Sequence, residues 1–274
     1  MKSTVLNYRL FLALLLIAPC ALPAFAAKKK PHYTKPPNNG GVYVAAHRGA
    51  HNDIPENTLA AYQKAIDLGC DFVEIDVRTS KDGHYVSVHN HDISSYVEGS
   101  TALVKDLTLA ELRALDIGIK HGEQWKGTQI PTFEEILALC KGKIGIYLDL
   151  KDAPVADLIT IIKEYDMEAQ IIWYASASQH EEIARLSKKC VSMPDPGPEK
   201  NLPRLIERLH PTAIASSWRH YSESFVKTCH DAGAIVIVDE SDPTCWDDCL
   251  AWGSDGIQTD HPAQLIEYLK KREK

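Results

Sequence analysis

The sequence predicts a TIM (β/α)8 barrel with a small insertion after the second barrel strand. From residue 42 onward, short apolar runs alternate with segments whose apolar residues recur at helical spacing. Eight such units within roughly 230 residues suit a closed barrel of parallel strands. Charged and imidazole side chains follow several of the apolar runs, as expected where the carboxyl ends of barrel strands meet. A doubly wound open sheet is the alternative, but no glycine-rich nucleotide loop follows the first run.

The expected elements follow from apolar periodicity and from helix-end signals. The predicted barrel strands cover residues 42–48, 71–78, 144–151, 170–175, 190–194, 212–217, 234–239 and 256–259. The predicted barrel helices cover residues 56–68, 154–165, 178–189, 199–209, 222–232 and 244–252, with one more after Pro262. Residues 84–89 form a hairpin partner of the second strand, after a turn at residues 81–83. Residues 92–131 form the insertion, whose one clear helix, 108–115, begins with a capping-box pattern.

The first 26 residues have the pattern of a secretory signal peptide. Lys2 and Arg9 precede an apolar run over residues 10–18, and Ala24-Phe25-Ala26 offers small residues three and one before a cut. The run is short for a membrane span and two prolines interrupt it, which disfavours an uncleaved anchor. Residues 27–41 indicate a flexible N-terminal segment, followed by a barrel over residues 42–274. We therefore expect an exported chain, periplasmic or extracellular, with no stable membrane anchor after cleavage.

Charge and cysteine content restrict the kinds of partner and metal site that the protein can have. Cleavage after Ala26 would leave 28 basic against 37 acidic residues. This surplus of acids disfavours nucleic acid or anionic membrane as a partner bound through bulk charge, although small anions could be bound locally. The six cysteines that remain could form disulfides in an exported protein. Cys245 and Cys249 could be half a zinc site, but no second pair completes it, so structural cysteines are favoured.

Two carboxylates stand two residues apart in the second predicted strand. Because side chains alternate along a strand, Glu74 and Asp76 share one face, while Val73, Ile75 and Val77 share the other. The β-branched face should be buried under helices. Like charges held this close repel one another, and a divalent cation between them removes the repulsion. A pair of solvated acids on an edge strand is the alternative, which the barrel setting disfavours.

Seven polar side chains fall at or near the carboxyl ends of predicted strands, where barrel enzymes carry out their chemistry. They are His47 and Arg48 after the first strand, Glu74 and Asp76 in the second, His89 at the end of the hairpin, and Asp149 with Lys151 at the end of the third. The last strand ends in Gln258-Thr259-Asp260 at the same mouth. Either histidine taken singly could be an ordinary core residue. All seven together indicate a functional site.

Several motifs occur together in a specific combination. They are Ala46-His47-Arg48-Gly49, Pro55-Glu56-Asn57-Thr58, Glu74-Ile75-Asp76-Val77, Asp82-Gly83 with His89 six residues later, Ser254-Asp255-Gly256-Ile257 and Thr259-Asp260. In these motifs, which extend over about residues 42–265, the sequence resembles the glycerophosphodiester phosphodiesterase family. The resemblance implies a TIM barrel with a small insertion after the second strand. It also implies metal-dependent cleavage of a small-molecule glycerophosphodiester to glycerol 3-phosphate and an alcohol.

Family roles carry over onto matching positions. They imply acid–base roles for His47 and His89, phosphate binding by Arg48, and metal ligation by Glu74 and Asp76. The third metal ligand of the family is commonly Glu, and Asp149, one methylene shorter, stands at the matching position. Three further departures bear on substrate identity: Asn90 in place of Asp, no arginine–threonine pair within residues 94–97, and Val238-Asp239-Glu240 in the late strand.

The residue types suit an anionic phosphodiester. A divalent cation together with Arg48 and Lys151 can neutralise the phosphate, and hard oxygen ligands favour Ca²⁺ or Mg²⁺ over zinc. We assign His47 as the base that deprotonates the nucleophile and His89 as the acid that protonates the leaving alcohol. No serine or cysteine belongs to the predicted site, so we expect a substrate hydroxyl to attack and form a cyclic phosphate.

Two other classes of protein are alternatives. A zinc hydrolase of the amidohydrolase type is suggested by His89-Asn90-His91, but it needs histidines at later strand ends, and none occurs within residues 173–176, 215–217 or 237–239. A non-catalytic secreted binding module on the same barrel is the second alternative. The intact charged site argues against it, because an inactive site has no physical reason to keep buried, repelling carboxylates.

Overall fold

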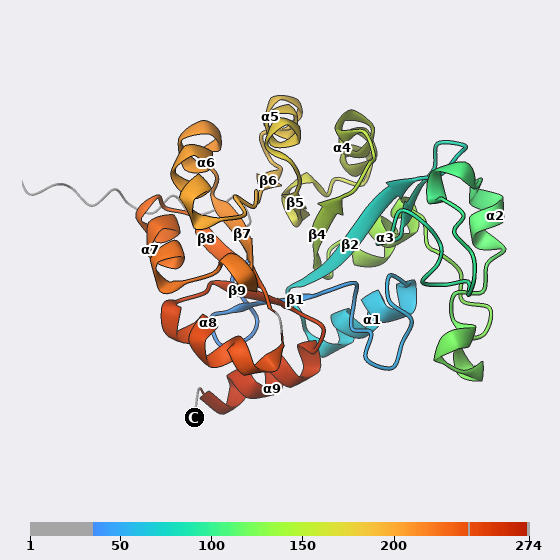
Figure 1. Ribbon diagram of the computed structural model, residues 1–274, viewed down its shortest axis with the longest axis horizontal. Coiled ribbons are helices and arrows are strands. Elements are labelled where there is room, and N and C mark those ends of the chain that lie inside the picture. The colour runs from blue at the N-terminus through green and yellow to red at the C-terminus, as the bar shows by residue number, and fades with distance from the viewer. Residues whose placement is uncertain (1–34, 241, 273–274) are drawn as a thin grey trace, which may run out of the picture.

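The computed structural model describes residues 35–240 and 242–272, so the predicted signal peptide lies outside the described residues. Parallel strands form a barrel surrounded by helices (Figure 1). The barrel strands are β1 (Tyr43–Ala46), β2 (Phe72–Thr79), β4 (Gly145–Leu150), β5 (Ile171–Tyr174), β6 (Val191–Ser192), β7 (Ala213–Ser217), β8 (Ile235–Asp239) and β9 (Gly256–Thr259). The covering helices are α1 (Leu59–Leu68), α3 (Phe133–Cys140), α4 (Val155–Glu164), α5 (Ala177–Leu186), α6 (Leu202–Leu209), α7 (Glu223–Asp231), α8 (Trp246–Trp252) and α9 (Pro262–Arg272).

The strands pair in the order β6-β5-β4-β2-β1-β9-β8-β7, which places the first strand between the second and the last. The remaining seam lies between β6 and β7, where the backbone N–H of Ala215 donates to the carbonyl of Pro194 at 3.1 Å. The sheet is therefore a nearly closed barrel of eight parallel strands. The predicted fold class is confirmed.

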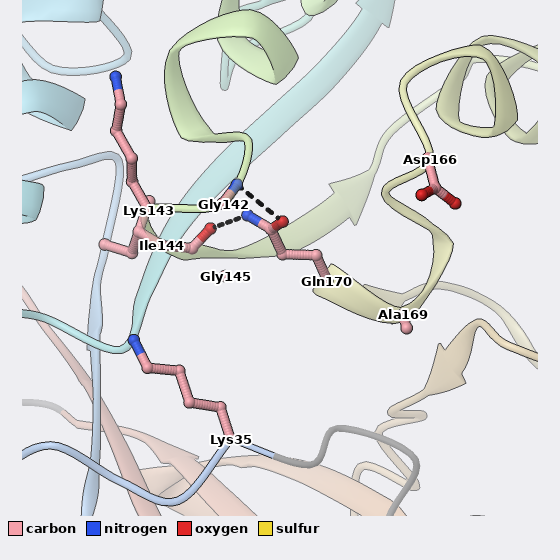
Figure 2. A pocket seen from close by; sticks show the side chains of 8 residues that line it. All are labelled: Lys35, Gly142, Lys143, Ile144, Gly145, Asp166, Ala169 and Gln170. Carbon is pink, nitrogen blue, oxygen red and sulfur yellow. Dashed lines mark hydrogen bonds between the residues drawn. The ribbon is translucent and has the colours of Figure 1, made fainter.

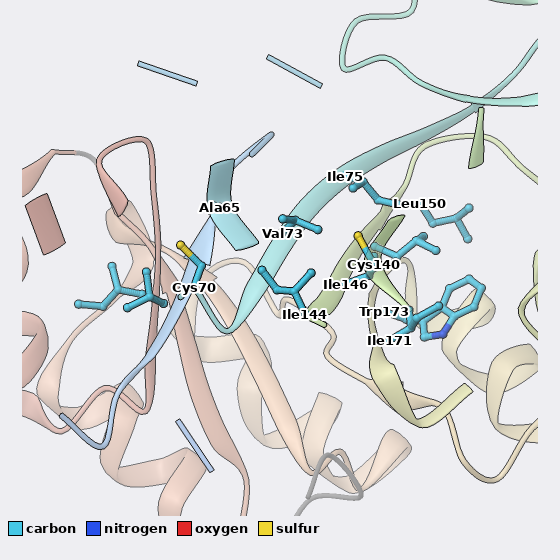
Figure 3. Packing of buried hydrophobic residues seen from close by; sticks show 14 of the residues in the cluster. Ala65, Cys70, Val73, Ile75, Cys140, Ile144, Ile146, Leu150, Ile171 and Trp173 are labelled. Carbon is cyan, nitrogen blue, oxygen red and sulfur yellow. The ribbon is translucent and has the colours of Figure 1, made fainter. Parts of the chain in front are cut away.

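The alternation of side chains along β2 divides the core into two layers. Val73, Ile75 and Val77 point outward into the large apolar cluster beneath the helices, part of which Figure 3 shows. Phe72 points inward and packs in the barrel interior with Tyr147 of β4 and other inward side chains. Each buried Val or Ile side chain contributes about 1.5–3 kcal/mol relative to exposure. This outward anchoring is what fixes Glu74 and Asp76 on the inner face.

Among the differences between the predicted helices and the structure, two concern α1 and α3. The first helix begins at Leu59, with Thr58 as its N-cap, and not at residue 56. The reason is that Asn57 has a left-handed backbone, with φ of 55°, which a helix cannot include. Helix α3 was not among the predicted elements, although Thr132 and Glu135 form a complete capping box at its start.

The insertion after β2 is present and forms a small satellite beside the barrel, on the right of Figure 1. It contains β3 (Tyr85–Ser87), which pairs antiparallel with β2, a 3₁₀ turn η1 (Val104–Asp106), and α2 (Leu109–Arg113). The capping box predicted at the start of α2 is confirmed. Its apolar side chains, Val86, Val88, Ile93, Tyr96, Val104, Leu112, Ile117 and Ile130, form a separate cluster.

Other expectations can be compared with the described residues. The end of the segment expected to be flexible is held on the barrel, because the backbone N–H of Asn38 donates to Asp71 Oδ1 at 2.8 Å. No disulfide is present among the described cysteines; the Sγ atoms of Cys245 and Cys249 lie 3.8 Å apart, against about 2.05 Å for a covalent bond. Every helix within the described ranges is too short or too polar to cross a bilayer.

Candidate active site

The seven predicted side chains converge at the carboxyl ends of the barrel strands. A cavity of about 200 Å³ opens there, and His47, Arg48, Glu74, His89 and Asp149 line it. The remaining two lie directly behind this lining: Lys151 Nζ is 2.6 Å from Asp149 Oδ2 and 3.0 Å from the fully buried Asp76 Oδ1. The convergence expected from strand ends is therefore what the fold produces.

Three carboxylates form the core of the site. Oxygen atoms of Glu74, Asp76 and Asp149 lie within 4.8 Å of one another. Glu74 and Asp76 are only 2% and 0% exposed, because neighbouring strands enclose the inner face of β2. Burial raises the pKa of Glu74 well above its ordinary value, and the charges of Asp76 and Asp149 raise it further. Burial also raises the pKa of Asp149, while Lys151 opposes that rise.

The cluster fits a hard divalent cation. Three carboxylates offer oxygen ligands within one ion's reach, which is the donor set that Ca²⁺ and Mg²⁺ prefer. Asp76 Oδ1 is buried without a hydrogen-bond partner among the described residues, and the Lys151 ammonium is the cation beside it. A buried carboxylate oxygen of this kind is costly unless a cation compensates it.

Backbone and side-chain donors orient the carboxylates. The N–H of Arg48 donates to Glu74 Oε2 at 2.7 Å, from a left-handed residue with φ of 51°. Asn57 Nδ2 donates to Asp76 Oδ2 at 2.8 Å. The carbonyl of the same Asn57 amide accepts from Tyr62 Oη and Ser87 Oγ, each at 2.9 Å. Asn57 therefore orients a candidate metal ligand, a role that sequence reasoning missed although its motif was noted.

The two predicted catalytic histidines, His47 and His89, have different hydrogen-bond partners. His47 Nδ1 lies 2.7 Å from Asp260 Oδ1, and His51 Nε2 lies 3.1 Å from the same oxygen. Burial alone would lower the pKa of His47, but the Asp260 hydrogen bond and the charge of Glu74 raise it to about 9. The two imidazoles in turn lower the pKa of Asp260. His89 Nδ1 lies 2.9 Å from the amide oxygen of Asn90, a neutral partner.

Arg48 has a fixed place at the edge of the cavity. Its Nη1 donates to both carboxylate oxygens of Glu56, at 3.0 and 3.1 Å. Glu56 therefore braces the arginine from the loop before α1, which begins three residues later at Leu59.

Comparison with known proteins identifies the family. The family model described as the glycerophosphoryl diester phosphodiesterase family matches residues 47–264. A glycerophosphodiester phosphodiesterase of Caldanaerobacter subterraneus subsp. tengcongensis is 32% identical over 249 residues, which cover 83% of this chain and 98% of the relative. The chain belongs to the glycerophosphodiester phosphodiesterase family.

Solved structures agree with this assignment. A phosphodiesterase of Oleispira antarctica, in complex with the product sn-glycerol-3-phosphate, superposes with a TM-score of 0.75 at 25% identity, covering 84% of this chain and 96% of the other. A putative glycerophosphoryl diester phosphodiesterase of Silicibacter pomeroyi has a TM-score of 0.74 at 24% identity, covering 85% and 94%. The protein is a glycerophosphodiester phosphodiesterase, and the amidohydrolase and non-catalytic alternatives are set aside.

The structure also shows where several residues around the cavity lie. His91, part of the suggested zinc pattern, has a side chain 75% exposed and lies beside Asp92. Trp218, which follows β7, stacks on Trp252 with ring centroids 5.4 Å apart. Tyr147, Tyr174 and Asp195, which sequence reasoning did not select, do line the cavity. Tyr147 lies on the inner face of β4, Tyr174 ends β5, and Asp195 follows β6 by three residues.

A second cavity, of about 290 Å³, lies at the other end of the barrel (Figure 2). Gly145 and Gln170, at the amino-terminal ends of β4 and β5, line it together with Lys35. The Gln170 amide spans this region: Nε2 donates to the carbonyl of Ile144, and Oε1 accepts from the N–H of Gly142 at 3.1 Å. In TIM barrels this end serves stability, and the chemistry of the phosphodiesterase belongs to the opposite end.

Proposed function

We propose that this phosphodiesterase cleaves glycerophosphodiesters to glycerol 3-phosphate and an alcohol, with a divalent cation held by Glu74, Asp76 and Asp149. The observation that carries the proposal is the carboxylate cluster beside His47 and Arg48 in one cavity. The related phosphodiesterase that holds sn-glycerol-3-phosphate supports the product assignment. When bound, Ca²⁺ or Mg²⁺ supplies positive charge that neutralises the phosphate and the charge developing on it.

The proposed acid–base roles follow from the support of each imidazole. Asp260 accepts a hydrogen bond from His47 Nδ1–H, which leaves Nε2 as the atom available to take a proton from the nucleophile. Burial lowers the pKa of His47, but the hydrogen bond to Asp260 and then the charge of Glu74 raise it to about 9. A divalent cation held by Glu74 would reduce the second of these raising effects. His89, with the neutral Asn90 as partner, would protonate the departing alkoxide.

The nucleophile proposed is the substrate's own neighbouring hydroxyl. Ser216 and Ser217 line the cavity, but Ser216 Oγ donates to the carbonyl of Ser217 at 3.2 Å, and among the described residues no histidine is hydrogen-bonded to either hydroxyl. Neither serine is therefore activated. Attack by the hydroxyl forms a bond to phosphorus as its proton passes to His47. The bond to the leaving alcohol breaks as His89 donates its proton, and water then opens the cyclic phosphate with the roles reversed.

The test compares glycerophosphocholine with its deoxy analogue, which lacks the attacking hydroxyl. We expect kcat to fall by at least about 10³ for the analogue, because intramolecular attack supplies much of the rate. Phosphorus NMR should also detect the cyclic phosphate during turnover of the normal substrate. Comparable kcat values for the two compounds would contradict substrate-assisted attack.

A substrate whose leaving group needs no proton distinguishes the acid role of His89 from the base role of His47. In a single turnover, the His89→Ala variant should release nitrophenolate from a glycerophosphodiester of p-nitrophenol at close to the wild-type rate, because nitrophenolate departs unprotonated. Opening of the cyclic phosphate, in which His89 would be the base, should be slow in this variant. The His47→Ala variant should stay slow with the same compound. The opposite pattern would exchange the two roles.

We also propose that the enzyme is exported and acts in the periplasm or outside the cell. Support comes from residues 1–26, with their basic start, apolar run and Ala-x-Ala end. The mass of the protein recovered from its native host decides this. A chain beginning at Ala27 is expected, and one that still carries Met1 would contradict export.

A further inference from the structure

Part of the substrate cavity has negative charge that the proposed chemistry does not use. Asp195, just after β6, and Asp239, at the end of β8, line the cavity with Tyr147 and Tyr174. We call these four residues the acidic wall. They lie in the same cavity as the site proposed for an anionic phosphodiester, where uncompensated carboxylates would repel the substrate.

Neither carboxylate of the acidic wall has a cationic partner. Within residues 35–240 and 242–272, no Lys, Arg or His nitrogen lies within 4.0 Å of Asp195 or Asp239. Asp195 accepts hydrogen bonds from Tyr174 Oη at 3.1 Å and from the N–H of Gly197 at 2.6 Å. Asp239 accepts one from Gln258 Nε2 at 3.0 Å. All of these donors are neutral.

The other charges of the cavity already have partners. Arg48 is paired with Glu56 and His47 with Asp260. Glu74, Asp76 and Asp149 are balanced by Lys151 and the proposed divalent cation. When the phosphate enters, Asp195 and Asp239 are the carboxylates with no cation in direct contact; the charges of His47 and Arg48 act on Asp239 only from beyond 4.0 Å.

Tyr147 indicates that the acidic wall is built to contact a ligand. It is 4% exposed, yet its hydroxyl has no hydrogen-bond partner among the described residues, and it lines the cavity. Its ring lies 6.0 Å from that of Tyr174, tilted by 40°. Aromatic rings beside carboxylates attract organic cations through both the ring quadrupole and direct charge.

We propose that the acidic wall binds an ammonium group carried by the leaving alcohol, so that preferred substrates are zwitterionic glycerophosphodiesters of amino alcohols. The proposal rests on the proposed function and names the substrate class of the same site. The ammonium supplies the counter-charge that Asp195 and Asp239 lack, while the phosphate at the other end of the substrate meets the cation and Arg48.

The experiment measures kcat/KM of the Ca²⁺- or Mg²⁺-loaded enzyme for glycerophosphoethanolamine, glycerophosphocholine and the neutral-alcohol compound glycerophosphoglycerol. We expect wild type to prefer both ammonium compounds by more than about tenfold. Asp195→Asn and Asp239→Asn, which are nearly isosteric, should each reduce that preference about tenfold. Asp231→Asn, which removes an exposed charge on α7, is the matched control and should keep it.

Calorimetric binding of the same three compounds to the metal-loaded His89→Ala protein provides a readout that does not require turnover. The acidic wall is supported if binding shows the same preference and if either Asn substitution removes it. This holds even if the wild-type enzyme cleaves none of the three compounds. That absence of turnover would contradict only the proposed function. A wild-type preference near one would overturn the inference. Equal losses for all three compounds in the Asn variants would overturn it too, because the carboxylates would then serve the glycerol end common to all substrates.

Discussion

Asn57 shows, at the scale of single residues, how a motif residue can orient a candidate metal ligand without itself lining the cavity. Its left-handed backbone ends the loop from β1, and its amide links Asp76 to Tyr62 and Ser87. Asp260 plays a comparable part for His47. Both residues act through another side chain, so their removal should affect the chemistry more than the affinity for substrate.

The first residue-scale prediction concerns the carboxylates. Glu74→Gln and Asp76→Asn should each abolish tight divalent-cation binding and lower kcat by about 10³, because the phosphate loses its principal counter-charge. Activity is measured with excess Ca²⁺ or Mg²⁺, and cation binding by calorimetry. Asp166→Asn, near the cavity at the opposite end of the barrel, is the matched control. Near-native rates in both variants would disprove the metal-site assignment.

The second concerns Asp260 as a positioning residue for His47. Asp260→Asn should lower kcat about 10²-fold with little change in KM, because the imidazole loses the carboxylate that fixes its orientation and stabilises its charged form. Asp260→Glu should restore part of the loss. Cation affinity should not change, since Asp260 lies outside the carboxylate cluster. A rise in KM with unchanged kcat would instead give Asp260 a substrate-binding role.

At the scale of elements, alternation and periodicity predicted the barrel strands to within a few residues. The β-branched outer face of β2 is an example, because the spacing of Val73, Ile75 and Val77 is enough to assign them to burial. The start of α1 was wrong because left-handed Asn57 is set by its bond to Asp76, a contact distant in sequence. Local patterns cannot contain such contacts.

The same limit applies to the site. The seven predicted residues could be found because each lies within or shortly after a strand whose neighbours in the barrel are fixed by the fold. Asp195 follows β6, a strand of only two residues whose sequence pattern is weak. Its approach to Tyr174 comes from the pairing of β5 with β6, which a single sequence does not display.

Helix α5 supports an element-scale prediction on pH and stability. His180 is 1% exposed on this helix, and burial lowers its pKa from 6.5 to about 4. A lowered pKa means that the unfolded chain takes up a proton first. His180 therefore contributes no pH dependence above about pH 6.5, and stability falls as pH drops toward 4, by up to about 3 kcal/mol.

The measurement is urea unfolding between pH 7 and 4 in the presence of a chelator, so that release of a cation does not contribute. His180→Leu should flatten the pH dependence in this window. His121→Gln, at an exposed position of the insertion, should leave it as in wild type. Identical slopes for wild type and His180→Leu would show that His180 is not the group responsible.

At the scale of the whole molecule, the barrel holds repelling carboxylates at the site where eight strands meet. Burial of Glu74 and Asp76 is unfavourable in the absence of a cation, and the outward apolar layer of the barrel offsets that cost. The buried carboxylates that the proposed function requires therefore lower the stability of the folded chain when no cation is bound. A cation that binds only the folded chain should reverse the penalty.

The last prediction follows from this opposition. Saturating Ca²⁺ or Mg²⁺ should raise the midpoint of thermal unfolding, since a ligand at 100 times its Kd stabilises the folded state by about 2.7 kcal/mol. Glu74→Gln keeps an oxygen that can accept from the N–H of Arg48 but removes one repelling charge. In chelator, this variant should therefore unfold at or above the wild-type temperature, and added cation should shift it little. Differential scanning calorimetry of both proteins, with and without cation, provides the comparison. A wild-type midpoint unmoved by millimolar Ca²⁺ and Mg²⁺ alike would remove the carboxylate cluster as a cation site, because a bound ion cannot avoid stabilising the state that binds it.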